Sequence, residues 1–540
     1  MFVGVKKIGG HEYIYLVENV REGGRHVQRT IKSLGRRDEV EGSGMLDALA
    51  ASAARHSRRS IVLSSYYRGE LAELRRASIG PDLVFGHLWR DTGCDQVIRS
   101  LLTERRFGFD VDRAIYLTVL HRLMVSGSDR HANSWQQAFR IPGTEDLILD
   151  QVYKAMAWLG EDIGEGGTTT DLIEEALYRH RQHLFDEVSV AFFDTTSLYF
   201  EGAGGQTLGQ LGYSKDYRPH LKQVVLGMVL DGSDRPFASF VWPGNTADVT
   251  RLTPVVQRLR TRFGISKACV VADRGMVSAE TIAGLEQSNI EYILGVRERS
   301  LSEVRRDVID DDGLAVPLLI PRQKGVTQLE IKDITLSGRR YVVRRNEEEA
   351  KKDAEARAEL IAGLERKLEQ GDKALVANKG YRRFLATPDD NHFTIDRERV
   401  ADEARFDGVF VLRTNTKLSA LQVVLRYRNL MAVEDSFKTA KALLATRPIF
   451  HKTDAGIRGH VFCSFLAMVL RKELFDRLAQ RNKKLEWKDI IDDLADLSEV
   501  EVNQDGRRAL LRTAPGSAID PICRALGIAL PPVFQELPAV

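Results

Sequence analysis

Between residues 188 and 296, short apolar segments with strand-like and helix-like patterns follow one another. They constrain the fold of this chain more than any other feature. Strand-like runs rich in β-branched and aromatic residues occupy 188–193, 223–230, 236–242, 268–272 and 292–296. Apolar residues at helical spacing cover 250–263 and 278–288, between the later runs. Three strands followed by alternating helices and strands predict an α/β fold, with a mixed sheet flanked by helices.

The rest of the chain predicts further parts on both sides of this segment. In chain order, the predicted parts are a β-rich segment ending in a polar linker over 36–60 (1–60), a largely helical N-terminal region (61–185), the first part of the sheet (186–296), a charged and partly strand-like insertion (297–407), the second part of the sheet (408–475) and a C-terminal helical region (476–540). A chain of 540 residues is long enough for several such parts.

Composition places the chain among ordinary globular proteins. Hydrophobic residues make up 43% and charged residues 29%, and the formal net charge is only +2, so overall charge says nothing about nucleic acid. The sequence contains no run of 18 apolar residues and no secretory signal pattern at its start, so no membrane association is expected. The four cysteines are widely separated, which favours a reducing cytoplasm over a disulfide or zinc framework.

Three acidic residues in the predicted sheet region are candidates for chemistry. Asp194 and Asp273 each follow a short apolar strand, where open α/β sheets place ligands. Glu434 lies on a long predicted helix over 418–444, seven residues from both Tyr427 and Lys441. Seven residues make about two helical turns, so an acid, a base and an aromatic donor share one stripe.

Each of these residues also has a simpler interpretation. An aspartate after a strand can start a turn or cap a helix. Glu434 can pair with Lys438 on a solvated helix face. The chemical interpretation is that three carboxylates from separate elements hold two divalent cations, which serve both ends of an in-line displacement at a phosphodiester.

Five stretches of the chain resemble one known family in their order and spacing. They are residues 193–199 (FDTTSLY), 212–223 (GYSKDYRPHLKQ), 242–248 (WPGNTAD), 271–276 (VADRGM) and 427–451 (YRNLMAVEDSFKTAKALLATRPIFH). Together they resemble a DDE transposase of the IS4-like class, and most of all its IS1634-type branch. The resemblance extends from the N-terminal strands to about residue 530.

The resemblance implies an RNase H-like catalytic core with a β-rich insertion between the second and third acids. It implies that Asp194, Asp273 and Glu434 are the catalytic residues and bind two Mg²⁺ or Mn²⁺ ions. The DNA contacts that it suggests, together with the basic loop after the first acid, are Tyr427, Lys441, Lys215, Arg218, Lys222, Arg274, Lys438 and Arg447. Leu430 departs from the family's helix signature, which has arginine there; Arg428 or Lys438 is the candidate substitute.

Other polar residues near these motifs have weaker functional interpretations. Asn245 and Asp248 either support the DNA end or the metal site, or make a turn and cap the next helix. Arg274 either reaches a phosphate or makes a structural ion pair. His451 is either a base contact or a helix-terminus partner. His460 lies on an apolar stretch and is expected to be a core histidine with its hydrogen bonds satisfied.

The expected function is therefore that of an insertion-sequence transposase in the bacterial cytoplasm, associated with the nucleoid when bound to DNA. It would hydrolyse one strand at each element end and transfer the freed 3′-hydroxyl into target DNA. The expected partners are double-stranded DNA, as terminal inverted repeats and target, and a second protomer, with residues 61–185 binding the DNA end. Two alternatives remain: a metal nuclease of the same fold without strand transfer, and an inactive DNA-binding derivative.

Overall fold

The structure is a computed structural model of the chain. It describes residues 1–22, 25–71, 73–164, 166–181, 188–202, 204–265, 268–296, 304–309, 315–321, 326–369, 383–389, 392–442, 446–504 and 507–538. The chain divides into two compact units: unit 1 comprises 1–80, 486–523 and 527–540, and unit 2 comprises 81–485 and 524–526. Within the described residues, every helix is too short or too polar to cross a membrane.

Unit 1 begins with strands, as the prediction of a β-rich segment requires. β1 (Phe2–Ile8), β2 (His11–Glu22) and β3 (Arg25–Arg36) form an antiparallel sheet. The segment predicted as a linker is instead helical, with α1 (Arg37–Gly42), α2 (Met45–His56) and the start of α3 (Arg58–Tyr67). Alanine-rich sequence favours the helical state of α2, and the Ser57 side chain caps α3 by accepting from the Ser60 N–H.

Unit 1 also contains a sheet where only helices were predicted. β4 (Glu73–Ser78) pairs with β18 (Ser498–Gln504), which continues to β19 (Arg507–Arg512) and β20 (Phe534–Glu536). The expectation of a helical C-terminal region is met only by α18 (Trp487–Asp496) and α19 (Ile519–Leu526). The sheet depends on pairing between segments more than 400 residues apart, which no local pattern reveals.

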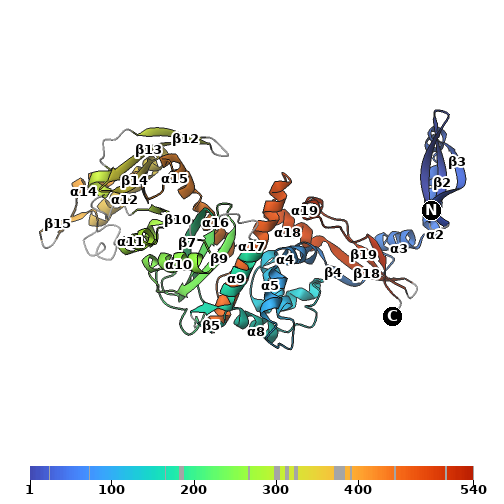
Figure 1. The fold of residues 1–540 in the computed structure, drawn as a ribbon, viewed down its shortest axis with the longest axis horizontal. Helices are drawn as coiled ribbons and strands as arrows, with labels where there is room; N and C mark the ends of the chain where they lie inside the picture. Colours follow the sequence, from blue (N-terminus) through green and yellow to red (C-terminus); the bar gives the residue numbers. More distant parts are fainter. Residues whose placement is uncertain are drawn as a thin grey trace. The chain divides into compact units, whose positions relative to one another are not determined.

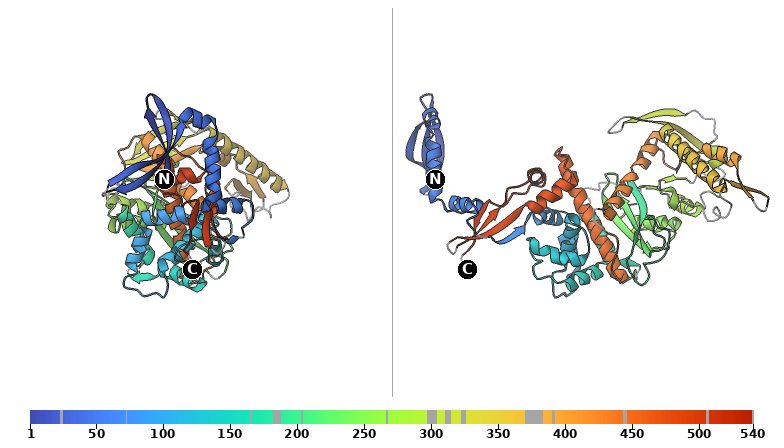
Figure 2. Two further views of the ribbon diagram at one scale, coloured as in Figure 1. Left: turned by 90° about the vertical axis from the view of Figure 1, so that its right-hand side faces the viewer. Right: turned by 180° about the vertical axis from the view of Figure 1, so that it is seen from behind.

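Unit 2 begins with the helical region that the sequence predicts. Its helices are η1 (Asp82–Gly86), α4 (His87–Asp91), α5 (Cys94–Leu101), α6 (Val111–Met124), α7 (Asp129–Trp135), η2 (Gln136–Ala138), α8 (Leu149–Leu159) and α9 (Thr169–His180), with short strands β5 (Asp162–Gly164) and β6 (Gly167–Thr168) before α9. α6 is buried along almost its whole length, beside α17 (Asp454–Gln480). Figure 2 shows α17 running between these helices and the sheet, and it contacts both α8 and β9.

The central sheet of unit 2 is mixed, as the strand order predicts. Its core strands are β7 (Val190–Tyr199), β8 (Gln223–Leu230), β9 (Pro236–Pro243), β10 (Cys269–Ala272), β11 (Tyr292–Gly295) and β17 (Val409–Thr414). β7, β8 and β9 are antiparallel neighbours, whereas β10 pairs in parallel with both β7 and β11. Short 3-10 turns, η4 (Asp248–Thr250) and η5 (Arg274–Met276), follow β9 and β10.

Different helices cover the two faces of this sheet. On one face, α10 (Leu252–Thr261) and α11 (Ala279–Gln287) pack over a cluster that includes Ala191 and Phe193 of β7 (Figure 1). Because side chains alternate along a strand, Phe192 and Asp194 point to the opposite face. α16 (Met431–Ala442) also packs against β7.

The predicted insertion extends the same sheet rather than forming a separate one. β12 (Val316–Pro321), β13 (Val326–Leu336) and β14 (Arg339–Arg345) continue it through pairing of β14 with β17. The other described elements of the insertion are η6 (Val304–Val308), α12 (Glu347–Glu369), β15 (Leu385–Asp389), β16 (His392–Ile395) and α14 (Arg397–Ala404). The insertion is therefore bonded to the core by a strand ladder, which restricts its motion.

The long helix predicted over 418–444 is broken in two. α15 (Ala420–Arg428) ends at Asn429, and α16 begins at Met431. Backbone bonds at the junction span three residues, such as Leu430 N–H to the Tyr427 carbonyl, so the chain is tightened there. Tyr427 thus lies on a different helix from Glu434 and Lys441, and the predicted single stripe is wrong. Leu430 is 5% exposed, so this position packs into the core instead of presenting a cation.

Candidate active site

Asp194 lies in the middle of β7, not at its end as the sequence predicted. β-branched Thr195 and Thr196 continue the strand, and the ladder with β8 runs to Tyr199. This places the carboxylate on a fixed backbone position on the sheet face opposite α10 and α11. A strand interior holds a side chain more rigidly than a loop does.

The surroundings of Asp194 disfavour its charge. Its side chain is 12% exposed. Burial raises the pKa of Asp194 to about 6, against the opposing effects of Lys215 and the Thr195 N–H, and the negative charges of Asp273 and Glu434 raise it further. Lys215 Nζ lies 3.6 Å from Asp194 Oδ1, and it donates to the Thr195 carbonyl at 2.5 Å. One lysine thus offsets only part of the negative charge.

Asp273 directly follows β10, as predicted, and lies beside Asp194. The parallel register aligns Ala272 with Phe193, so the next residue on each strand is one of the two acids. The Tyr427 hydroxyl donates to Asp273 Oδ1 at 2.9 Å. Burial, followed by the charge of Asp273, raises the pKa of Tyr427 well above its usual range, so the phenol stays protonated.

Glu434 lies in the first turn of α16 and is exposed. Its charge contributes to the raised pKa of Asp194, which places it in the electrostatic neighbourhood of the first acid. The alternative pairing with Lys438 is not formed, because Lys438 Nζ bonds Asp435 Oδ1 at 2.8 Å instead. Asp194 and Asp273 are therefore neighbours on adjacent strands, and Glu434 lies on α16, which packs against β7, close enough for its charge to act on Asp194.

The basic residues suggested for DNA occupy two kinds of environment. Lys222 and Arg274 are exposed, and the Arg218 guanidinium stacks 4.7 Å from the Tyr199 ring centroid. Lys441 and Arg447, in contrast, both pair with Asp216, at 2.7 and 2.5 Å. Their suggested role at DNA phosphates stays a prediction.

The sequence analysis did not identify two residues that contribute to the surroundings of the first acid, Asp216 and Arg251. Asp216 stands inside the GYSKDYRPHLKQ motif, but its partners are more than 200 residues away and gave no local signal. Arg251 pairs with Asp248 and donates to Thr195 Oγ1 at 3.2 Å, next to the first acid. The spacing of three residues between Asp248 and Arg251 was a visible signal for that pair. Asp248 is thus an ion-pair partner at a 3-10 turn, whereas its predicted role as a cap of the next helix is wrong, because Arg251 is the N-cap of α10 and no side chain caps it.

Comparisons with known proteins place this geometry in a family. The family model of the transposase DDE domain matches residues 188–470, more than half of the chain, and contains all three acids. The chain belongs to the DDE transposases. A second model, the N-terminal domain of IS1634 family transposases, matches residues 4–65 and specifies the IS1634 type. The comparison with curated proteins gave no match.

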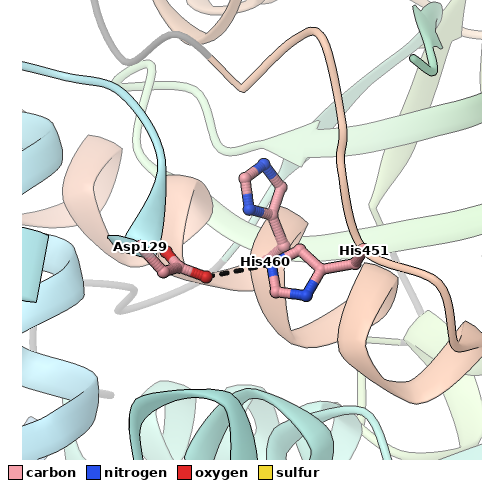
Figure 3. A group of neighbouring side chains, drawn as sticks. All are labelled: Asp129, His451 and His460. Carbon is pink, nitrogen blue, oxygen red and sulfur yellow. Dashed lines mark hydrogen bonds and ion pairs between the residues drawn. The ribbon is translucent and has the colours of Figure 1, made fainter. Parts of the chain in front are cut away.

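Membership of the DDE transposases implies insertion-sequence transposition, DNA binding and use of divalent metal. Among the described residues, only Asp129, His451 and His460 offer three ligand atoms within 4.8 Å of one another (Figure 3). The carboxylates of the DDE set are more widely spaced than that. This transposase therefore has two distinct polar clusters to compare as metal sites.

The cluster of Asp129, His451 and His460 is already satisfied by protein groups. Arg122, 1% exposed, lies 2.8 Å from His460 Nδ1 and 3.5 Å from Asp129 Oδ1. His460 Nε2 contacts the Thr446 carbonyl at 3.2 Å, and His451 Nε2 bonds Asp129 Oδ2 at 2.9 Å. Arg122 therefore supplies a positive charge to this cluster from within the protein, and the prediction that His460 is a satisfied core histidine is confirmed.

Proposed function

We propose that this transposase cuts DNA at the ends of its insertion sequence and joins the freed ends to target DNA, with Asp194, Asp273 and Glu434 as its catalytic residues. The observation that carries the proposal is the convergence of the three acids from separate elements, with a pKa of about 6 at Asp194. Two cations lie near Asp194: Lys215, and Arg251, which also pairs with Asp248. Because Arg251 is shared with Asp248, the three acids keep an excess of negative charge, which divalent cations would neutralise.

The donor set fits two hard cations better than one. Carboxylate oxygens are the ligands that Mg²⁺ and Mn²⁺ prefer. With ions about 3.5–4 Å apart and metal–oxygen bonds of about 2.1 Å, ligands on opposite ions lie up to about 8 Å apart. Ligand atoms that hold a pair of ions can therefore be more than 4.8 Å apart, which agrees with the spacing of the three acids. When bound, such ions would activate water and stabilise the leaving oxygen.

The chain's own groups would hold and orient this site. Asp194, fixed within β7, would hold the ions together with Asp273 and Glu434. The Tyr427 hydroxyl orients Asp273 through its 2.9 Å hydrogen bond. We further propose that the strands from β9 through β8, β7 and β10 to β11 are the RNase H-like core, because three antiparallel strands precede two parallel ones.

DNA would approach the loop between β7 and β8. Tyr213 and Tyr217 are 82% and 95% exposed there, and Lys215, Arg218 and Lys222 give the loop positive charge. Exposed aromatic rings among cations suit stacking on bases and contacts to phosphates. Lys438 and Arg274 would add phosphate contacts from other elements. Two protomers would pair the two DNA ends, so that cutting is coupled.

The reaction has two displacements at phosphorus. In the first, water attacks one strand at each element end and releases a 3′-hydroxyl. In the second, that hydroxyl attacks a target phosphodiester, so that one phosphodiester forms as another breaks. No covalent bond between protein and DNA is required.

The deciding experiment incubates the chain with labelled DNA carrying the element's ends and Mg²⁺, and sizes the products on a denaturing gel. We expect strand cleavage at the ends, lost by roughly 10³-fold or more in Asp194→Asn and Glu434→Gln because a metal ligand is removed. DNA binding should persist in both. Asp435→Asn, one residue further along α16 and exposed, is the matched control and should cleave normally.

Two outcomes would contradict the proposal. Cleavage without strand transfer, tested with pre-cut ends, would make the protein a nuclease. Binding without any metal-dependent cleavage would make it an inactive DNA-binding derivative.

A further inference from the structure

Asp216 is a buried carboxylate between two cations from a distant part of the chain. Its side chain is 8% exposed; Lys441 is 12% and Arg447 28% exposed. Lys441 Nζ donates to Oδ1 at 2.7 Å. Arg447 Nη1 lies 2.5 Å from Oδ2 as a close ion pair without hydrogen-bond geometry. Asp216 therefore neutralises cations on α16 and on the segment that follows it.

The preceding residue points its functional groups toward the first acid. The Lys215 backbone N–H donates to Ser197 Oγ of β7 at 2.8 Å. Its Nζ contacts the Thr195 carbonyl and lies 3.6 Å from Asp194. Two consecutive residues thus connect β7, which carries the first acid, with α16, which carries the third.

Further contacts fix the same junction. Arg218 and Arg447 both stack on the Tyr199 ring, at 4.7 and 5.7 Å from its centroid. The Ile449 N–H donates to the Tyr199 carbonyl at 3.1 Å. The end of β7, the loop and the segment after α16 are therefore one packed assembly around Asp216.

The pairing is a polar anchor for α16, whose apolar side is buried through Val433, Phe437 and Ala440. Lys441 and Glu434 are seven residues apart on this helix, so they lie along one side of it, with Cα atoms about 10.5 Å apart along the axis. The bond from Lys441 to Asp216 therefore holds the side of α16 that carries Glu434. Burial lowers the pKa of Lys441, and nearby Arg447 and Lys215 lower it further, so these cations need a counter-ion.

We propose that Asp216 is a positioning residue of the active site. It serves as the internal counter-ion of Lys441 and Arg447, and so fixes the position of Asp194 relative to Glu434. In this role Lys441 is an internal cation rather than a contact to DNA phosphate. This inference rests on the proposed function only where its test measures cleavage; the DNA-binding measurement does not depend on that function.

The test uses the full chain in four forms besides wild type: Asp216→Asn, Lys441→Met, the double variant, and the exposed control Asp435→Asn. Single-turnover cleavage in Mg²⁺ should fall about 100-fold in Asp216→Asn, because small misplacements of catalytic groups have effects of that size. In the double variant, Lys441→Met removes the cation that Asp216→Asn leaves unpaired. Cleavage by the double variant should therefore be about tenfold faster than cleavage by Asp216→Asn. The control should match wild type.

DNA binding in EDTA gives a readout that does not need catalysis. Neutralising Asp216 should leave the DNA Kd within about threefold of wild type or tighten it, because positive charge increases. Lys441→Met should leave the slope of log K against log salt unchanged. A phosphate contact would instead reduce that slope by about 1 and weaken binding.

Each result decides the proposal. Wild-type cleavage by Asp216→Asn, a double variant slower than Asp216→Asn, or a reduced salt slope in Lys441→Met would each overturn it. Thermal melting of every form checks folding, and if Asp216→Asn alone does not fold, the salt slope of Lys441→Met still decides. If wild type itself does not cleave, the proposed function fails, whereas the salt slope still assigns Lys441.

Discussion

Unit 2 contains two polar clusters with opposite charge balance. Around Asp194, the carboxylates gather with Lys215 and with Arg251, which is shared with Asp248, and burial raises the pKa of the aspartate to about 6. Around Asp129, burial also opposes ionisation, but the hydrogen bond from His451 and the charge of Arg122 outweigh it and hold the pKa below its usual range. The histidine-rich cluster is the closer-packed of the two, yet it is internally neutralised.

The difference separates a site built to receive a cation from one built to stabilise the fold. Close ligand spacing alone favours Asp129, His451 and His460 as a metal site. Charge balance favours the three acids, because an excess of like charge in a folded protein is unfavourable until a ligand compensates it. The three predictions below test this contrast, from the largest expected effect to the smallest.

Removing the internal cation should have the largest effect. Arg122→Met leaves Asp129 buried without its positive partner and removes the bonds to His460 and Ser464. We expect the free energy of unfolding to fall by about 3–5 kcal/mol, as for other broken buried pairs. Urea or thermal denaturation measures the loss.

The matched control is Lys154→Met in α8. Lys154 pairs with Asp150 at 2.7 Å, but both side chains are more than 60% exposed, so the change should be under about 1 kcal/mol. Equal losses in the two variants would show that the Arg122 cluster is not a special stabilising element.

Divalent metal should stabilise the chain through the three acids only. Mg²⁺ at about 100 times its Kd should increase the free energy of unfolding by about 2.7 kcal/mol and raise the melting temperature by a few degrees. The shift should vanish in Asp194→Asn and persist in Asp129→Asn. A shift that depended on Asp129 instead would reverse the assignment of the two clusters.

Asp194→Asn should stabilise the metal-free chain. A folded pKa of about 6 against an ordinary 3.8 means that ionised Asp194 opposes folding at pH 7. Removing this charge should increase the free energy of unfolding by about 1–3 kcal/mol at pH 7 in EDTA. Below the folded pKa the native carboxyl is protonated, so the difference from wild type should shrink as pH falls from 7 to about 4.

Denaturation curves at several pH values measure that difference. If the difference in the free energy of unfolding between Asp194→Asn and wild type stayed constant with pH, ionised Asp194 would not be destabilising the folded chain.

Much of the fold was visible in the sequence because it follows from local periodicity. The strands before Asp194 and Asp273, the helices between them and the helices of residues 80–185 appear where apolar spacing places them. Long-range pairing was not visible. The joining of β4 to β18, and of β14 to β17, depends on hydrogen bonds between backbones that any sequence can supply.

The candidate site divides in the same way. The three acids were identifiable from the apolar strand residues before the two aspartates, from the helical pattern around Glu434 and from family motifs, although Asp194 proved to lie inside its strand. The break at Asn429 between α15 and α16, which separates Tyr427 from Glu434, was not, because a helical apolar pattern continues across it. Asp216 was not recognised either, since its partners are fixed only when the loop folds onto α16.

The sequence by itself therefore determined most elements of the central sheet region, their order and the family, since apolar spacing and motifs are local properties of the chain. The tertiary structure alone decided which charges are compensated: Lys441 and Arg447 by Asp216, Arg122 by Asp129, and the three acids only in part. The physical reason is that electrostatic energy depends on distance and burial in space, and neither quantity is encoded in the spacing of residues along the chain.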